Sequence, residues 1–110
     1  MVPINNYKKN YLSFVAKWLD YIGSLNNLAE NTKIAYGSDV KQFFKFLEAR
    51  SESFGNLIEP KSLTTSDMRA WFSTERKKGT TSRSLARKLS AVKHFFEWLS
   101  ERESFDASVI

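Results

Sequence analysis

The sequence is poor in the residues that build covalent, metal-bound or membrane-spanning structures. It has no cysteine, which excludes disulfide bonds, thiolate zinc sites and a cysteine nucleophile. His94 is the only histidine and has no partner at ligand spacing, so we expect no metal or other cofactor. No apolar run approaches the roughly 20 residues that span a bilayer, and the N-terminus lacks a signal segment. We therefore expect a soluble, cytoplasmic protein with no membrane partner.

Residues that interrupt regular structure are also scarce. There are only two prolines and four glycines among 110 residues, while 42% of the residues are hydrophobic and 15% aromatic. This composition is typical of a globular chain rather than a disordered one, and the length suffices for a single core. The sequence therefore predicts one small domain.

Positive charge is abundant and gathers in one part of the chain. The net charge is +5. Residues 61–93 carry nine basic and two acidic side chains, whereas residues 1–60 carry seven and six, and residues 94–110 one and four. A basic block on a domain this small favours a polyanionic partner such as nucleic acid, although a solvated basic surface is the alternative.

Apolar residues at helical spacing predict four helices, and no segment shows convincing strand-type alternation. The first helix buries Leu12, Val15, Ala16, Leu19 and Ile22. We expect an all-α, four-helix fold. The first helix is expected at residues 10–24, and the second from a cap at Asn31 or Thr32 to about Arg50. The third is expected from a cap at Thr65 or Ser66 to before Gly79, and the fourth from Thr81 or Ser82 to about Ser100.

The second and fourth predicted helices each carry a polar stripe away from their apolar one. Small outer residues on the fourth helix, such as Ser84 and Ser90, would let it approach a DNA major groove closely. Arginine and lysine would neutralise phosphates, and Arg83 and Arg87 could donate two parallel hydrogen bonds to a phosphate or to the edge of a guanine. The outer stripes comprise Ile34, Ser38, Lys41 and Lys45 on the second helix and Arg83, Arg87, Ser90 and His94 on the fourth.

Aromatic residues and His94 have structural interpretations that we prefer. The three tryptophans fall on or beside core faces, which indicates packing rather than stacking on nucleic-acid bases. Tyr36 lies on the buried stripe without a neighbouring base or cationic clamp, so we interpret it as a core residue and not a nucleophile. His94 is expected to be a hydrogen-bonding surface residue.

Two segments resemble a known family. The "NT…Y…DV…F…FL" spacing within residues 31–47 and "SRSLARKLSAVKHFFEWL" at 82–99 are similar to the N-terminal core-binding (SAM-like) domain of phage-integrase-type tyrosine recombinases, and most of all to the Xer recombinases. The similarity covers about residues 10–103. It implies a four-helix domain that clamps a recombination half-site through its second and fourth helices. The DNA-binding residues it implies are Thr32, Lys33, Lys41, Arg83, Ser84, Arg87, Lys88, Ser90 and His94.

The same resemblance shows what this chain lacks. The family's tyrosine nucleophile and its arginine, lysine and histidine residues lie in a separate C-terminal domain, and no tyrosine follows Tyr36 here. We therefore expect no catalysis by this chain. We expect a flexible lead at residues 1–9, the DNA-binding domain at 10–103 and the start of a linker at 104–110. The expected partners are double-stranded DNA and, in the full-length protein, other recombinase protomers.

The isolated domain is expected to be monomeric. A helical protein-interaction module, whose basic face binds an acidic partner, is the alternative function. The sequence does not identify the DNA site, and it does not separate base contacts from phosphate contacts.

Overall fold

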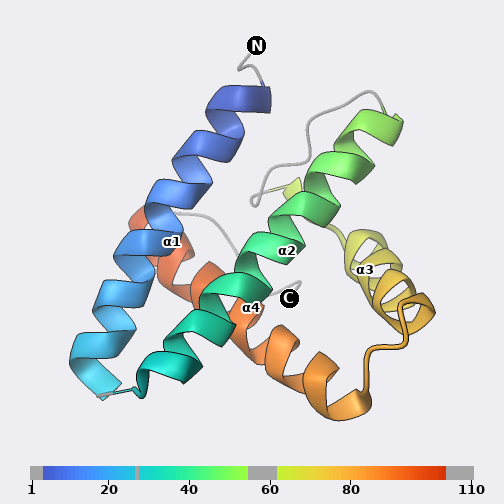
Figure 1. Ribbon diagram of the computed structural model, residues 1–110. Coiled ribbons are helices and arrows are strands. Elements are labelled where there is room, and N and C mark those ends of the chain that lie inside the picture. Colours follow the sequence, from blue (N-terminus) through green and yellow to red (C-terminus); the bar gives the residue numbers. More distant parts are fainter. Residues whose placement is uncertain (1–3, 27, 55–61, 104–110) are drawn as a thin grey trace.

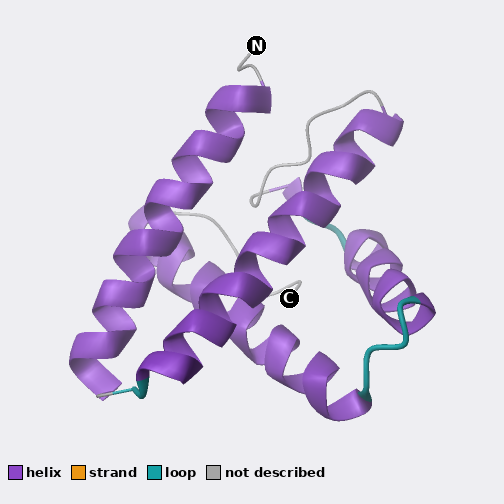
Figure 2. Cartoon of the chain, in the orientation of Figure 1, coloured by secondary structure: helices purple, strands orange, loops and turns teal. Residues whose placement is uncertain are grey.

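The computed structural model describes residues 4–26, 28–54 and 62–103, and this part of the chain folds into four α-helices (Figure 1). Figure 2 shows helices and short connections but no strand within these ranges. The predicted all-α, four-helix fold is confirmed. The helices are α1 (Ile4–Asn26), α2 (Glu30–Phe54), α3 (Thr65–Lys77) and α4 (Ser82–Glu103).

Helix α1 begins earlier than predicted. It starts at Ile4 and not at residue 10, so residues 4–9 extend the helix and do not form an irregular lead. Pro3 directly precedes Ile4 in the sequence, and proline at the start of a helix is compatible with helical geometry. Residues 1–3, the Gly55 and Pro60 connection and the 104–110 tail lie outside the described residues. The linker therefore stays a prediction, whereas residue 10 lies inside α1 and does not mark the start of the helix.

Helix α2 is longer than predicted at both ends. It begins at Glu30, and the backbone N–H of Lys33 donates to the carbonyl of Ala29, so neither Asn31 nor Thr32 is its cap. At the other end it continues past Arg50 to Phe54. Ser51 is buried there, and its hydroxyl is satisfied because it donates to the carbonyl of Leu47 at 2.7 Å.

Helix α3 has well-defined ends. Thr64 caps it, one residue before the predicted Thr65, and forms a capping box with Asp67. At the C-terminal end Gly79 has a φ of 83°, a conformation that favours glycine. The N–H groups of Gly79 and Thr80 donate to the carbonyls of Arg76 and Glu75, which satisfies the last turn. The chain then reverses into α4, where Thr81 accepts from the backbone N–H of Ser84 at 3.1 Å.

The core is aromatic and lies between α1, α2 and α4, with α3 covering one side. Phe43 is fully buried and meets Trp71 and Phe96 edge to face at centroid distances of 4.9 and 5.6 Å. Trp18, Trp71 and Trp98 are all buried, which confirms that they are packing residues. The buried hydrophobic residues are Val15, Trp18, Ile22, Val40, Phe43, Leu47, Leu63, Met68, Trp71, Ala91, Val92, Phe95, Phe96, Trp98 and Leu99.

The predicted buried face of α1 was partly wrong. Leu12 and Ala16 are exposed, whereas Trp18 is fully buried. Helix α1 packs against both α2 and α4, so its buried face is centred on Trp18 and Leu12 is left at the edge. Gly37 allows α1 to approach closely, because a Cβ atom there would lie 2.9 Å from Leu19 Cδ1.

Candidate nucleic-acid interface

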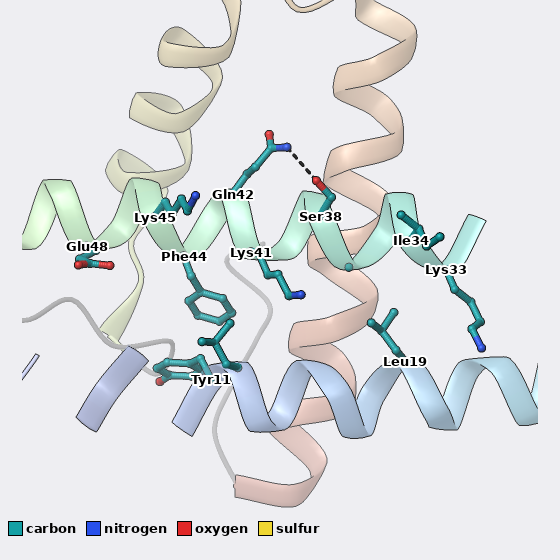
Figure 3. A pocket seen from close by; sticks show the side chains of 12 residues that line it. Tyr11, Leu19, Lys33, Ile34, Ser38, Lys41, Gln42, Phe44, Lys45 and Glu48 are labelled. Carbon is teal, nitrogen blue, oxygen red and sulfur yellow. Dashed lines mark hydrogen bonds between the residues drawn. The ribbon is translucent and has the colours of Figure 1, made fainter. Parts of the chain in front are cut away.

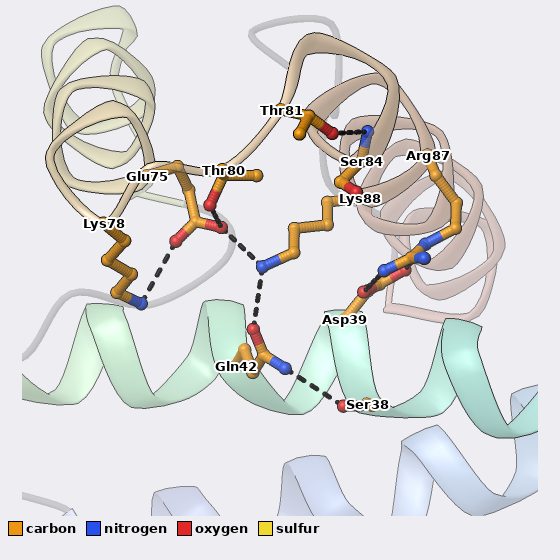
Figure 4. Close-up of polar contacts among 10 residues, drawn as sticks. All are labelled: Ser38, Asp39, Gln42, Glu75, Lys78, Thr80, Thr81, Ser84, Arg87 and Lys88. Atoms are coloured by element: carbon orange, nitrogen blue, oxygen red, sulfur yellow. Dashed lines mark hydrogen bonds and ion pairs between the residues drawn. The ribbon is translucent and has the colours of Figure 1, made fainter.

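Helices α2 and α4 cross, and a partly buried ion pair joins them near the crossing (Figures 1 and 4). The Arg87 guanidinium donates from Nε to Asp39 Oδ2 at 3.0 Å and from Nη2 to Oδ1 at 2.9 Å. Asp39 is 1% exposed, whereas the side chain of Arg87 is 45% exposed. The hydrogen bonds to Asp39 raise the pKa of Arg87 above its ordinary value. The pair fixes how the two helices cross and leaves part of the guanidinium at the surface.

A second polar cluster joins α3 to α2 and α4 (Figure 4). The buried Glu75 carboxylate accepts from Lys88 Nζ at 2.6 Å, and Lys78 Nζ lies 3.1 Å from its other oxygen. Lys88 also donates to Gln42 Oε1 at 2.9 Å, and Gln42 donates to Ser38 at 3.0 Å. The Lys88 side chain is only 12% exposed. Its ammonium is therefore enclosed by protein groups.

A third ion pair ties the second half of α2 to the start of α3. Arg50 Nε donates to Asp67 Oδ1 at 2.6 Å, while Asp67 Oδ2 accepts from the backbone N–H and hydroxyl of Thr64. Burial disfavours the charged form of Asp67, but these hydrogen bonds outweigh it and hold the pKa of Asp67 below its ordinary value. In the same way, the hydrogen bonds from Lys88 and Lys78 outweigh burial and lower the pKa of Glu75.

The lowered pKa values of Asp67 and Glu75 predict a loss of stability in acid. The unfolded state binds protons near the ordinary carboxyl pKa of about 4, before the folded state does. The two groups therefore stabilise the fold fully above that value, and their contribution falls as pH drops toward the folded pKa values. Urea unfolding between pH 7 and pH 3 should show this decrease, and it should be smaller in Glu75→Gln. An unfolding free energy that does not change over this range would contradict the prediction.

The predicted interface residues fall into two groups: those whose side chains have no ion pair in the described part of the chain, and an engaged group whose side chains are already paired with other residues of the protein. Lys41, Arg83 and Ser90 are exposed, and Ser84 and Thr32 are half-buried. Neither Lys41 nor Arg83 forms an ion pair or side-chain hydrogen bond with another described residue. The engaged group already has partners within the protein. Lys33 lies 3.4 Å from Glu30, and Arg87 pairs with Asp39. Lys88 pairs with Glu75, and His94 accepts a hydrogen bond from Trp18.

His94 is exposed but also tied to the core. Trp18 Nε1 donates to its Nδ1 at 2.8 Å, so the ring proton of a neutral His94 lies on Nε2. The expected hydrogen-bonding role therefore has a partner inside the protein. In addition, no cluster of three metal-binding side chains occurs within residues 4–26, 28–54 and 62–103.

Sequence reasoning missed the acidic residues that organise this surface. Asp39 and Glu75 were not among the predicted site residues, yet each anchors a cation of α4. Asp39 follows directly on a small exposed serine and precedes the buried Val40, so it lies beside the apolar stripe of α2. A carboxylate at such a position needs a partner, and this is the signal that could have identified it.

A groove between α1 and α2 forms a different kind of surface (Figure 3). It has a volume of 690 Å³ and includes Leu19 and Phe44, with Tyr11 stacked on Phe44 at 4.4 Å. Leu12 and Ile34 are exposed at this groove, and Ile34 is 61% exposed. Three lysines accompany these apolar side chains: Lys33, Lys41 and Lys45.

The described helices include none that is both long enough and apolar enough to cross a membrane. Four helices around an aromatic core, with cations exposed on two crossing helices, define a small all-α domain with a basic surface. The chain belongs to the family of phage integrase N-terminal SAM-like domains, whose family model matches residues 15–103. The predicted resemblance and the SAM-like fold class are therefore confirmed.

Several relatives of this chain are tyrosine recombinases. The chain is 26% identical over 98 residues to the tyrosine recombinase XerC of Rickettsia massiliae, covering 89% of this chain and 32% of that protein. It is 30% identical to XerC of Rickettsia prowazekii over 87 residues, covering 79% of this chain and 28% of that protein. For XerC of Brucella suis the identity is 30% over 92 residues, with coverage of 84% and 29%.

The chain thus spans about a third of the length of the relatives it matches. No solved structure matches it significantly. The similarity places this chain at the N-terminal SAM-like part of the family and implies a connection with DNA recombination.

Proposed function

We propose that this chain binds double-stranded DNA as the N-terminal domain of a tyrosine recombinase, through the exposed faces of α2 and α4, and that it does not itself cleave DNA. The observation that carries the proposal is that both crossing helices bear exposed cations with no ion pair to another described residue, among them Lys41 on α2 and Arg83 on α4. Family membership supports it, because the named relatives are tyrosine recombinases.

The physical argument concerns charge and shape. Exposed cations without a carboxylate partner can neutralise phosphates, and this releases the counterions condensed on the DNA. Lys41 and Arg83 are such cations in the described part of the chain. Ser38 and Ser90 are exposed on the same two helices and have small side chains, so the helices can approach the groove closely. Exposed Lys93 adds charge further along α4.

The nine expected DNA contacts have different roles in this proposal. Lys41 and Arg83 bind phosphates, while Ser84 and Ser90 provide small hydrogen-bonding groups at the contact surface. Arg87 presents the exposed part of its guanidinium at this surface while Asp39 holds it. Lys88 contributes by holding α3 and α4 together, since its ammonium is occupied by Glu75 and Gln42. Thr32, Lys33 and His94 lie at the edges of this surface and contribute less.

Charge reversal at Lys41 and Arg83 tests the proposal. We expect the Lys41→Glu/Arg83→Glu variant to bind a duplex of about 30 base pairs at least about tenfold more weakly than the original chain. The slope of log affinity against log salt should fall by about 0.9 for each phosphate that the variant no longer neutralises. Fluorescence anisotropy at several salt concentrations measures both effects.

Lys17→Glu is the matched control for this experiment, because Lys17 is an exposed lysine on α1, where it lies over the Phe14 ring. It should change the affinity much less than either Lys41→Glu or Arg83→Glu alone. Equal losses at all three positions would mean that only the net charge matters. Unchanged affinity in a folded double variant would overturn the proposal.

A protein-interaction module is the second candidate, and the groove between α1 and α2 favours it. Exposed Leu12 and Ile34 are unusual on a surface that meets only phosphates, and the adjacent lysines suit a helix with acidic edges. In this case Ile34→Asp would abolish capture of an acidic partner and leave DNA affinity unaltered. Assembly with other protomers on DNA belongs to the whole recombinase, and we propose that this domain alone is monomeric.

A further inference from the structure

We propose that Arg87 reads a guanine in the major groove and that the buried Asp39 is the residue that positions it. This inference rests on the proposed DNA-binding function and adds a base contact to it. It is carried by the geometry of the Arg87 and Asp39 pair, which uses one edge of the guanidinium and leaves the other edge without a hydrogen bond to any residue that the structure describes (Figure 4).

The guanidinium has five N–H donors, and Asp39 uses only one side of it. Nε and Nη2 donate to the two carboxylate oxygens at 3.0 and 2.9 Å. The end-on edge, formed by Nη1 and the second N–H of Nη2, still has two parallel donors. Guanine presents two adjacent acceptors, O6 and N7, in the major groove, and this pair matches such a fork.

Charge separates a guanine contact from a phosphate contact. Asp39 is 1% exposed and directly paired with Arg87, so the two side chains together carry no net charge. A neutral pair attracts phosphate weakly and releases few counterions, but its hydrogen-bond donors keep their direction. Arg83, one helical turn earlier on α4, is exposed and has no such carboxylate among the described residues. Arg83 therefore suits a phosphate, and Arg87 suits a base.

The surroundings of Arg87 agree with this role. A free arginine loses side-chain entropy when it binds, whereas Arg87 is already held by two hydrogen bonds. Its side chain is nevertheless 45% exposed, in contrast to Lys88, which is 12% exposed and enclosed. Ala86 and Ser90 on the same helix are exposed and small, so they would not keep the base edges of the DNA major groove out of reach of the guanidinium.

The first test leaves the protein unchanged. Duplexes with a randomised central segment are selected with the original chain, and each enriched guanine is then replaced by 7-deazaguanine, which lacks the N7 acceptor. We expect one position at which this replacement weakens binding about fivefold or more, and little effect elsewhere. If binding is tight but selects no guanine, or if no 7-deazaguanine weakens it, the inference is wrong. The proposed binding of phosphates by Lys41 and Arg83 would not be affected by that outcome.

The second test uses matched substitutions of two arginines on the same helix. Arg87→Lys should remove the preference at that guanine, because lysine lacks the fork, while the salt slope stays nearly constant. Arg83→Lys should keep the preference for that guanine, because lysine also binds a phosphate, and any loss of affinity that it causes should be the same for all duplexes. The opposite pattern would assign base reading to Arg83 and overturn the inference.

Asp39→Asn tests the positioning role. Asparagine keeps the shape but not the charge, so Arg87 is held less firmly and the preference for that guanine over other bases should fall. Affinity for unselected DNA should not fall, because the freed Arg87 charge can now bind phosphate. A parallel loss of affinity for all duplexes would indicate a purely structural role for Asp39 and overturn its positioning role. Absence of duplex binding by the original chain would instead refute the proposed function itself.

Discussion

Replacing Phe43 by alanine is expected to lower the free energy of unfolding by about 3–5 kcal/mol. Phe43 is fully buried at the centre of the domain, where its ring contacts side chains of α3 and α4 edge to face. The substitution removes the transfer free energy of the ring and leaves a cavity that rigid neighbours do not fill. A domain of this size has about 5–15 kcal/mol in total, so the variant should be close to its unfolding limit.

Urea denaturation followed by far-ultraviolet circular dichroism measures this loss. Ile34→Ala is the control, since Ile34 is a large apolar residue of the same helix but is mostly exposed. Its effect should stay within about 0.5 kcal/mol. Phe43→Leu should lie between the two, because leucine fills part of the cavity. A loss below about 1 kcal/mol for Phe43→Ala would show that Phe43 is not the centre of the core.

The hydrophobic patterns of α2 and α4 could be interpreted correctly from the sequence because each helix has one apolar face. Val40, Phe43 and Leu47 recur at helical spacing and are buried, and the intervening Lys41 and Lys45 are exposed. Helix α1 was harder because its apolar residues spread over more of its surface than its neighbours cover. Its buried face is centred on Trp18, while Leu12 at the edge remains exposed. Periodicity alone does not say which edge of a wide apolar face is covered.

Helix ends were predicted less well than helix faces. The cap of α2 was expected at Asn31 or Thr32, but the helix already includes both. Polar residues near a helix start can serve equally well inside the first turn, and the sequence offers several of them. Gly79 was more informative, because its positive φ ends α3 and such a conformation favours glycine.

Exposure of the candidate interface was predictable, but the pairing of its cations was not. A helical wheel placed Arg87 and Lys41 outward, and both are exposed. The wheel contains no information on residues of other helices, and Asp39 lies 48 positions before Arg87 in the sequence. Consequently Arg87 and Arg83 looked equivalent, although only one of them is held by a carboxylate among the described residues. The difference between a base contact and a phosphate contact depends on this tertiary pairing.

Replacing Glu75 by glutamine is expected to lower the free energy of unfolding by about 3 kcal/mol. The Glu75 side chain is 2% exposed and accepts from Lys88, whose ammonium is almost enclosed. Glutamine keeps the size of the side chain but removes its charge, which leaves the ammonium buried without its counterion. The cost comes from this unpaired charge and not from a change in packing. Thermal or urea unfolding measures it.

Two further variants separate the charge effect from a general effect of mutation near α3. Lys78→Ala removes the more exposed partner of Glu75, whose side chain is 59% exposed, and should cost less than about 1 kcal/mol. Glu75→Met/Lys88→Met removes both buried charges and should regain most of the stability that Glu75→Gln gives up. If the double variant is as unstable as Glu75→Gln, the hydrogen bonds that Thr80 donates to Glu75 and that Lys88 donates to Gln42 hold this cluster together rather than the ion pair, because the double variant forms neither of them.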